Sequence, residues 1–448
     1  MKTKIIPIGL LGLVLSGLLS TYASNIQARL ELDRRVLPAD TQNIAVVKIT
    51  LDAAKAPEEA NRPPVNLSIV LDKSGSMAGE KIHRAREAAM EAVRRLGQSD
   101  LFSLVNYDHQ VHTLIPAQQV RQIDGLEQKI RQIRTGGNTA LFGGVSQGAN
   151  EIRKAINQKK YVHRIILLSD GLANVGPQSP AELGRLGTSL IKEGISVTSV
   201  GIGNNYNEDL MTRLSAKSDG NAYFAESAVD LPHILSAELG DVLNVVARKV
   251  VITIECPEGV RPKRIIGREG RVTSNTVEIG LNQLYGGQEK YALVEVEIDP
   301  RANNEEIEIA KATVQYEDAM TAKPTRAHAL CPAKFSDDKE LIAANCNIAV
   351  QTEVVRNTAA YNRDLAITNA ENGNTIEAVK ILQENEQMLM DWGNTHKNGE
   401  FIADAEEQNL QWNYLQTKGL TKENRKRLRT DSYNDRYQQS SKSKLFRK

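Results

Sequence analysis

Residues 69–77 constrain this chain more than any other stretch, because a strand-like apolar run ends there in a short loop of oxygen-bearing side chains. The loop places Asp72, Ser74 and Ser76 at alternating positions. A hard divalent cation such as Mg²⁺ prefers oxygen ligands in near-octahedral geometry and keeps some of its waters, so these side chains can bind it directly or through water. Asp and Ser also favour turns and helix N-caps, so this run taken alone is more often a capped turn than a metal site.

Two later segments favour a metal site over a capped turn, because each brings another oxygen ligand to the end of a predicted element. Residues 135–141 form a Gly-rich loop that opens a helix and carries Thr139, and residues 165–171 are an apolar strand that ends at Asp170. The five residues resemble the metal-ion-dependent adhesion site of the von Willebrand factor type A (VWA) domain, with every motif position occupied: Asp72, Ser74, Ser76, Thr139 and Asp170. The resemblance covers roughly residues 65–235 and implies a site that captures an acidic residue of a protein partner.

The charge of the predicted site leads to the same expectation. Two aspartates cancel the charge of a divalent cation, whereas hydroxyls coordinate it without adding charge, so the metal stays electrophilic toward a further anionic oxygen. Mg²⁺ is favoured, and the same oxygen ligands admit Ca²⁺ or Mn²⁺. The alternative is an ion that only stiffens the three loops, since an ion at ten times its Kd stabilises a fold by about 1.4 kcal/mol.

Hydrophobic periodicity predicts the fold around this site. Apolar residues recur at intervals of three and four over residues 80–96 and 141–156, which is typical of amphipathic helices. Near-continuous apolar strands at 101–107, 164–169 and 195–200 alternate with these helices and with another at 180–192. Such alternation predicts an α/β fold with a doubly wound, mostly parallel sheet, in which ligands bind beyond the carboxyl ends of the strands.

The segments on either side of this unit alternate apolar and polar residues, which is typical of half-buried strands. We expect residues 24–60 and 246–325 to supply the strands of one small antiparallel β-sandwich, into which the VWA domain is inserted. This layout resembles extracytoplasmic VWA proteins related to inter-α-trypsin inhibitor heavy chains and a group of bacterial secreted VWA proteins. Two unrelated flanking pieces are the alternative.

The last part of the chain changes to helical spacing. Residues 337–418 are expected to form a helical region that acts as a packing module. Beyond it, residues 421–448 contain ten Lys or Arg against three acidic residues and few apolar ones. We interpret them as a solvated, partly disordered basic tail, with contact to an anionic envelope surface or partner as the alternative.

The first residues indicate export. Lys2 and Lys4 precede an apolar stretch about as long as a secretory h-region, and residues 21–23 include small residues suited to cleavage. We therefore expect residues 1–23 to be a signal peptide that directs the protein to the periplasm, the cell surface or the medium. A retained signal anchor is the alternative, although the stretch is shorter than the roughly 20 apolar residues of a membrane span.

Three cysteines are an odd number for a protein in an oxidising compartment. Cys331 can pair with Cys346 across a short loop or with Cys256, and all three can also stay reduced. The sequence does not choose among these arrangements, but at least one cysteine lacks a partner within the chain.

Composition and motifs exclude several classes of function. A formal net charge of +1 favours neither nucleic acid nor an acidic membrane as a partner. The sequence contains no Walker loop and no His or Cys cluster at metal-ligand spacing. Because no base or nucleophile accompanies the cation, we expect no catalytic residue and no organic cofactor.

The sequence therefore predicts a secreted or envelope-associated protein-binding module of the adhesion type, not an enzyme. Its partner would present an Asp or Glu side chain to the bound cation. The alternative is a non-catalytic regulatory or assembly subunit of an envelope enzyme or a secretion complex. The oligomeric state is not determined by the sequence.

Overall fold

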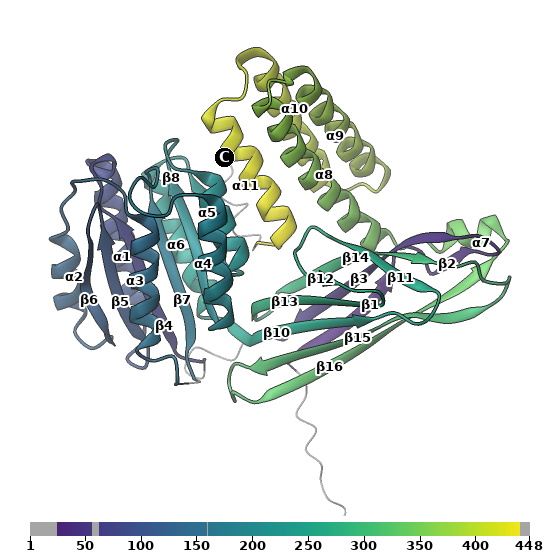
Figure 1. Ribbon diagram of the computed structural model, residues 1–448, viewed down its shortest axis with the longest axis horizontal. Helices are drawn as coiled ribbons and strands as arrows, with labels where there is room; N and C mark the ends of the chain where they lie inside the picture. The colour runs from purple at the N-terminus through teal and green to yellow at the C-terminus, as the bar shows by residue number, and fades with distance from the viewer. Residues whose placement is uncertain (1–24, 56–61, 159, 440–448) are drawn as a thin grey trace, which may run out of the picture.

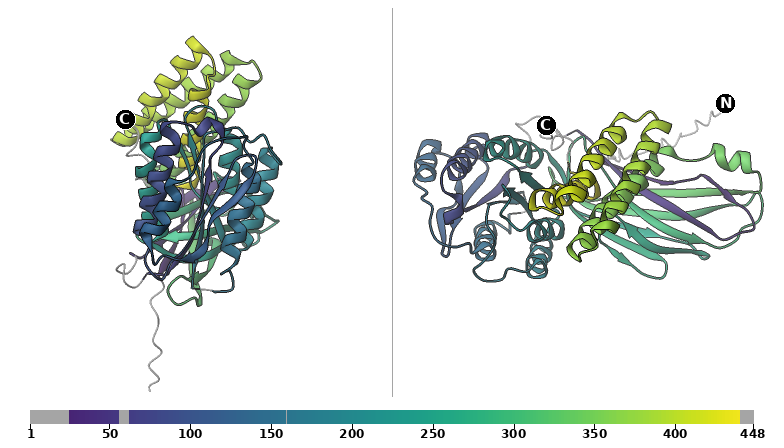
Figure 2. Two further views of the ribbon diagram at one scale, coloured as in Figure 1. Left: turned by 90° about the vertical axis from the view of Figure 1, so that its left-hand side faces the viewer. Right: turned by 90° about the horizontal axis from the view of Figure 1, so that it is seen from above.

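The computed structural model describes residues 25–55, 62–158 and 160–439. An α/β unit, a β-sandwich and a bundle of helices lie side by side in it (Figure 1). Seen from above, the helices lie over the junction between the other two parts (Figure 2). The predicted signal peptide, residues 1–23, lies outside the described residues.

The α/β unit is built on a six-stranded sheet with the order β6-β5-β4-β7-β8-β9. All neighbouring strands are parallel except β6, which forms an antiparallel hairpin with β5. Helices cover both faces, so the predicted doubly wound, mostly parallel sheet is confirmed. The elements are β4 (Val65–Asp72), η2 (Gly75–Met77), α1 (Glu80–Arg95), β5 (Leu101–Tyr107), β6 (Val111–Gln119), α2 (Ile123–Arg131), α3 (Leu141–Arg153), β7 (Val162–Ser169), α4 (Pro180–Lys192), β8 (Ile195–Ile202), α5 (Glu208–Lys217), β9 (Ala222–Ala225), η3 (Ala228–Asp230) and α6 (Leu231–Val242).

Strand β4 shows why the sequence folds this way. All eight of its residues are buried, and successive side chains point to opposite faces of the sheet. Leu67, Ile69 and Leu71 pack in the cluster that contains the apolar faces of α1 and α6, whereas Val70 packs with α3 on the other side. Both faces of the strand are therefore buried, and apolar residues fill five of its eight positions.

The sandwich pairs a four-stranded sheet, β1-β3-β14-β11, with a six-stranded sheet, β12-β13-β10-β15-β16-β2. Residues 43–52 of β3 pair with residues 289–298 of β14, so the chain before the α/β unit and the chain after it share one sheet. The predicted insertion is thus confirmed, and the alternative of two unrelated flanking pieces is wrong. The strands are β1 (Ile26–Leu32), β2 (Val36–Pro38), β3 (Asn43–Ala53), β10 (Val245–Glu255), β11 (Val260–Ile266), β12 (Arg271–Val272), β13 (Thr276–Tyr285), β14 (Glu289–Ile298), β15 (Glu306–Asp318) and β16 (Pro324–Ser336).

The sandwich extends further than predicted. It includes β16, which pairs with β15 along its length, so the expected end at residue 325 is wrong. Pro324 and Pro332 lie within this strand, and its first seven residues alternate between exposed and half-buried rather than buried. The inward-facing positions of the strand do alternate, but most of them are Ala, so the apolar signal is weak and the prolines interrupt it.

Four long helices follow the sandwich. After the short α7 (Lys339–Ala344), the chain forms α8 (Ile348–Glu371), α9 (Thr375–Thr395), α10 (Gly399–Lys418) and α11 (Lys422–Tyr437). The helical region is confirmed, but the disordered tail predicted from residue 421 is wrong for residues 422–437, which form α11. Residues 440–448 lie outside the described part of the chain.

Acidic residues of the α/β unit explain why α11 is ordered. Lys426 is buried against Glu208 at the start of α5, with its Nζ 2.7 Å from the Glu208 carboxylate and 4.7 Å from the centre of the Tyr206 ring. Arg425 pairs with Glu208 and with Asp209. The basic residues that suggested a solvated tail thus bind carboxylates far away in the sequence.

The three cysteines remain unpaired in the structure. Cys256 and Cys331 are buried in the sandwich core, and Cys346 is half-buried. Burial raises the pKa of Cys256 to about 11 and, together with nearby acidic groups, that of Cys331 to about 12. Neither of the two disulfides considered from the sequence is formed.

Within the described residues, no helix combines the length and apolar character needed to cross a membrane.

Replacing Lys426 by Met is expected to lower the free energy of unfolding by about 2 kcal/mol, because Glu208 loses a charge-assisted hydrogen bond in a buried site. The matched control is Lys422→Met on the same helix, since Lys422 is exposed and makes no ion pair among the described residues. Urea unfolding followed by circular dichroism measures both variants. Equal stability of the two variants would show that α11 does not depend on this contact.

Candidate metal centre

The five predicted ligands come from three loops at one edge of the α/β sheet. β4 and β7 are parallel neighbours, and their pairing aligns Leu71 with Leu168, so both strands end at the same level. Asp72 is the last residue of β4, and Asp170 directly follows β7. The two aspartates therefore lie at the carboxyl ends of the strands, where ligands bind in a parallel α/β sheet.

Asp72 is a fully buried carboxylate that hydrogen bonds hold in place. Its Oδ1 accepts from the backbone N–H of Ser74 at 2.8 Å, and its Oδ2 accepts from the Ser169 hydroxyl at 2.6 Å. Burial nevertheless raises the pKa of Asp72 from 3.8 to about 6, because the hydrogen bonds compensate only part of the lost hydration. A cation at this place would supply the missing stabilisation of the carboxylate.

Asp170 connects the first loop to the third. Its Oδ1 accepts a hydrogen bond from the Ser76 hydroxyl at 2.7 Å, and the Ser74 and Ser76 hydroxyl oxygens lie 3.1 Å apart. Asp170 and Ser74 are buried, whereas Ser76 is exposed to solvent. The group of oxygen atoms is therefore buried at Asp170 and Ser74 and open to solvent at Ser76.

Backbone hydrogen bonds attach the Gly-rich second loop to the other two. The N–H of Gly75 donates to the carbonyl of Gly137 at 3.1 Å, and the N–H of Gly136 donates to the carbonyl of Lys73 at 2.8 Å. The N–H of Thr139 donates to the Asn174 side chain at 2.7 Å, while the Thr139 carbonyl accepts from the Asn174 N–H at 3.1 Å. The position of the buried Thr139 is thus set by both neighbouring loops.

Gly171 shows that Thr139 and Ser76 face a common space. A Cβ atom at Gly171 would lie 3.0 Å from the Thr139 hydroxyl oxygen and 3.3 Å from the Ser76 hydroxyl oxygen. A side chain at this position would therefore enter the space that the hydroxyls face. The structure brings all five predicted ligands together here, and Gly171 is an additional residue that keeps the site open.

The donor set fits a hard divalent cation. It consists of two carboxylates and three hydroxyls, all of them oxygen ligands. No group of three or more His, Cys, Asp or Glu side chains in the described part of the chain is arranged to hold a metal ion. A cation at the five-oxygen site would thus be neutralised by two carboxylates and would keep its attraction for a further anion.

Lys81 brings a positive charge to the edge of the candidate site. Its ammonium group pairs with the second carboxylate oxygen of Asp170 and lies 3.4 Å from the carbonyl oxygen of Ser76. Lys81 is at the start of α1, directly after the first loop, and is partly exposed. The Lys81 ammonium group therefore already neutralises Asp170. A metal ion that binds Asp170 has to compete with this group.

Sequence reasoning named the five candidate ligands but not the residues that surround them. Ser169, Asn174, Gly171 and Lys81 contact ligands or border the site, and none belongs to the five-residue motif. Ser169 and Gly171 were visible as direct neighbours of Asp170. The sequence did not indicate a role for Lys81 or Asn174, because Lys in helices and Asn in loops are common on protein surfaces.

Comparison with known proteins agrees with this geometry. The family model of the von Willebrand factor type A domain matches residues 66–237. An uncharacterised Synechocystis protein, sll0103, is 26% identical over 60% of this chain and 66% of its own length. Inter-alpha-trypsin inhibitor heavy chain H2 of Mus musculus is 31% identical over 37% of this chain and 18% of its own length. The chain thus spans less than two thirds of either relative.

Two solved structures share the whole architecture. A von Willebrand factor type A protein from Catenulispora acidiphila covers 92% of this chain and 98% of its own, with a TM-score of 0.70 and 17% identity. The ArnB paralog VWA2 from Sulfolobus acidocaldarius has the same coverage and identity, with a TM-score of 0.64. At this identity the likeness concerns the fold alone, and it extends well beyond the α/β unit.

Replacing Gly171 by Ala is expected to weaken Mg²⁺ or Mn²⁺ binding about tenfold, because the added methyl group meets the Thr139 and Ser76 hydroxyls. The matched control is Gly136→Ala in the second loop, where a Cβ atom meets nothing within 4 Å. Isothermal titration calorimetry measures both variants. If Gly171→Ala binds the metal as tightly as Gly136→Ala, the hydroxyls do not border the metal position.

Replacing Lys81 by Met is expected to strengthen Mg²⁺ binding about threefold, because the ion no longer competes with the ammonium group for Asp170. Lys73→Met is the control, since Lys73 lies beside Asp72 in the sequence but pairs with Asp108. Both affinities are measured by calorimetry at constant ionic strength. A weaker affinity in Lys81→Met would mean that Lys81 supports the metal site instead of competing for it.

Proposed function

Because residues 66–237 form a von Willebrand factor type A domain, we propose that this protein is a metal-dependent protein-binding module. In this proposal a divalent cation at the sheet edge captures an Asp or Glu side chain of a partner protein. Asp72, Ser74, Ser76, Thr139 and Asp170 hold the cation, with Mg²⁺ favoured and Ca²⁺ or Mn²⁺ as alternatives. The protein is a binding protein without catalytic activity of its own.

The observation that carries the proposal is the grouping of two fully buried carboxylates with three hydroxyl residues, of which Ser76 is exposed. Asp72 and Asp170 are inaccessible to solvent, whereas Ser76 is exposed. Buried carboxylates need a compensating positive charge, and Lys81 supplies it only to Asp170. A dication satisfies both carboxylates at once and remains reachable from solvent.

Each residue has a distinct task in this proposal. The hydroxyls of Ser74, Ser76 and Thr139 supply neutral oxygen ligands, and the two aspartates supply the negative charge directly or through water. Ser169 and Asn174 orient Asp72 and Thr139 through the hydrogen bonds described above. When bound, the cation supplies a positive centre with a coordination position that a partner's carboxylate can occupy.

The place of action is part of the proposal. The basic start, the apolar stretch and the small residues within residues 1–23 support export to the periplasm, the cell surface or the medium. Millimolar Mg²⁺ or Ca²⁺ is available in such compartments, so a site of modest affinity is filled there.

The test is capture of a native partner with and without chelator. Protein immobilised in Mg²⁺ is expected to retain a partner from the envelope fraction of its source organism, and EDTA should release it. Asp72→Ala should lower the partner affinity at least about tenfold, because half of the charge that holds the metal is lost. Asp124→Ala is the control, since Asp124 is an exposed carboxylate of the same domain without an ion pair among the described residues.

The affinity for the captured partner is then measured by calorimetry in Mg²⁺ and in EDTA. Equal affinity in Mg²⁺ and in EDTA would overturn the proposal. Co-purification of one partner at fixed stoichiometry would favour the alternative, in which the metal site joins this protein permanently to an envelope enzyme or a secretion complex as a regulatory or assembly subunit.

A further inference from the structure

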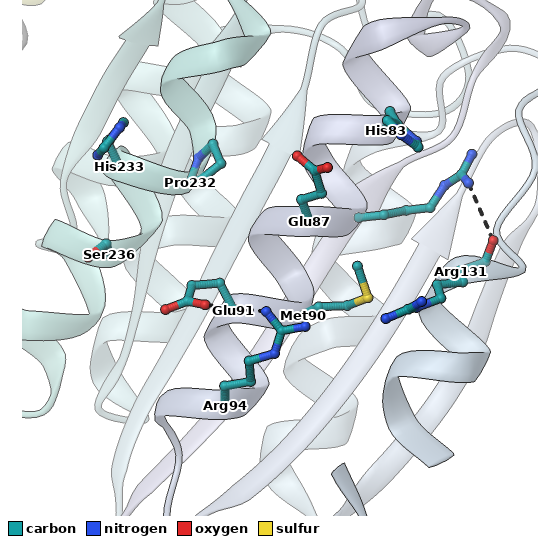
Figure 3. Close-up of a pocket in the computed structure, with 10 residues that line it drawn as sticks. His83, Glu87, Met90, Glu91, Arg94, Arg131, Pro232, His233 and Ser236 are labelled. Atoms are coloured by element: carbon teal, nitrogen blue, oxygen red, sulfur yellow. Dashed lines mark hydrogen bonds and ion pairs between the residues drawn. The ribbon is translucent and has the colours of Figure 1, made fainter. Parts of the chain in front are cut away.

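A groove of about 660 Å³ runs along the outer face of α1, between α2 and α6. Figure 3 shows His83, Met90 and Arg94 along α1, with Arg131 on one side and Pro232 on the other. Residues 83 to 94 span about 16 Å of helix, so the groove is elongated. Nearly buried Met90 forms part of an apolar floor, and basic side chains border it.

Arg86 is the unusual residue of this groove. Its guanidinium donates to the backbone carbonyl of Arg131 at 3.3 Å but makes no ion pair with any described carboxylate. Its Nε is buried and has no hydrogen-bond partner in the described part of the chain. Burial and the nearby charge of Arg134 lower the pKa of Arg86. The positive charge at this point is therefore not neutralised within the fold.

The other charges of the groove are matched. Glu127 accepts from Arg94 at 2.7 Å and from Arg131 at 2.9 Å. The acidic residues of the groove wall are also paired, Glu87 with Arg84 and Glu91 with Arg94 and Arg95. The excess charge is therefore positive, and it is concentrated near Arg86 and Arg134.

Two of the elements that line the groove are connected directly to loops of the proposed metal site. α1 begins at Glu80, four residues after Ser76, so His83 lies only about one helical turn from the start of the helix. On the other wall, the chain leaves α2 at Arg131 and reaches Thr139 through the Gly-rich loop. α1 and the chain after α2 thus both connect to loops that carry proposed metal ligands.

From this arrangement we infer that the groove binds an acidic polypeptide segment of the partner, with Arg86 as its anchor. The inference deepens the proposed function and rests on it only in assuming that the partner is a protein. A segment that gives one carboxylate to the cation would place further carboxylates along α1. The groove itself binds without metal.

An extended acidic chain fits the groove better than a compact anion does. Arg86 and Arg94 are eight residues apart on one helix, which separates them by about 12 Å along its axis. A compact anion would contact only the region of Arg86, whereas a peptide can follow the groove and cover the apolar floor at Met90 and Pro232. His83 and His233 do not make the groove a metal site, since no described group of three such ligands is arranged to hold an ion.

The test uses a fluorescein-labelled hexaglutamate peptide and the purified protein in EDTA, so the metal site does not contribute. Fluorescence anisotropy is expected to show binding that weakens as salt is added. Arg86→Gln should weaken it about fivefold or more, and the charge reversal Arg86→Glu should abolish it. Arg121→Gln is the control, because Arg121 is an exposed arginine of the same domain without an ion pair among the described residues.

Three results would overturn the inference. One is no binding of the peptide, and another is equal weakening by Arg86→Gln and Arg121→Gln, which would indicate unspecific attraction. The third is tighter, Arg86-dependent binding of tripolyphosphate, which would indicate a phosphate site. Peptide binding is measured in EDTA, whereas partner capture by the metal site requires Mg²⁺, so failure of the metal-dependent proposal is distinguishable from failure of this one. Thermal unfolding confirms that each variant is folded.

Discussion

The pairing of β4 with β7 is the constraint on which the metal site depends. Parallel register aligns Leu71 with Leu168, so two buried strands end side by side and each continues into an aspartate. The Ser169 hydroxyl, which donates to Asp72 at 2.6 Å, joins the two strand ends directly. A shift of one residue would turn every side chain of a strand to the other face of the sheet, so the same packing that buries β4 also positions Asp72.

The sandwich is attached at the opposite end of the same strands. Arg164, near the start of β7, is completely buried and donates to Gln283 at 2.7 Å and to the Tyr285 hydroxyl at 2.6 Å on β13. Its guanidinium also lies 3.3 Å from Glu238 of α6. Six residues of strand separate Arg164 from Asp170, which is about 20 Å. The sandwich is therefore fixed at this end by a buried charge network, while the edge with the metal ligands stays free of it.

Much of the fold and of the site was predictable from the sequence, for reasons visible in particular residues. β4 and β7 each contain an apolar run shortly before they end, because both faces of a central parallel strand are buried, and this run makes them recognisable. The five ligands follow such strands or open a helix, so local pattern was enough to find them. β16 was missed because its prolines and exposed positions hide its pairing with β15. The basic residues of α11 suggested disorder, although Glu208 and Asp209 neutralise part of their charge from more than 200 positions away.

The sequence by itself determined the strands and helices of the α/β unit and named the five oxygen ligands that we propose. These follow from hydrophobic periodicity and from polar residues at element ends, which are local properties of the chain. Tertiary structure alone decided that Lys81 pairs with Asp170, that α11 docks on α5 and that Arg86 has no partner carboxylate in the described part of the chain. Ion pairs between distant segments depend on distances that only the folded chain defines, so charge composition does not reveal which charges are neutralised and which remain free to bind a partner.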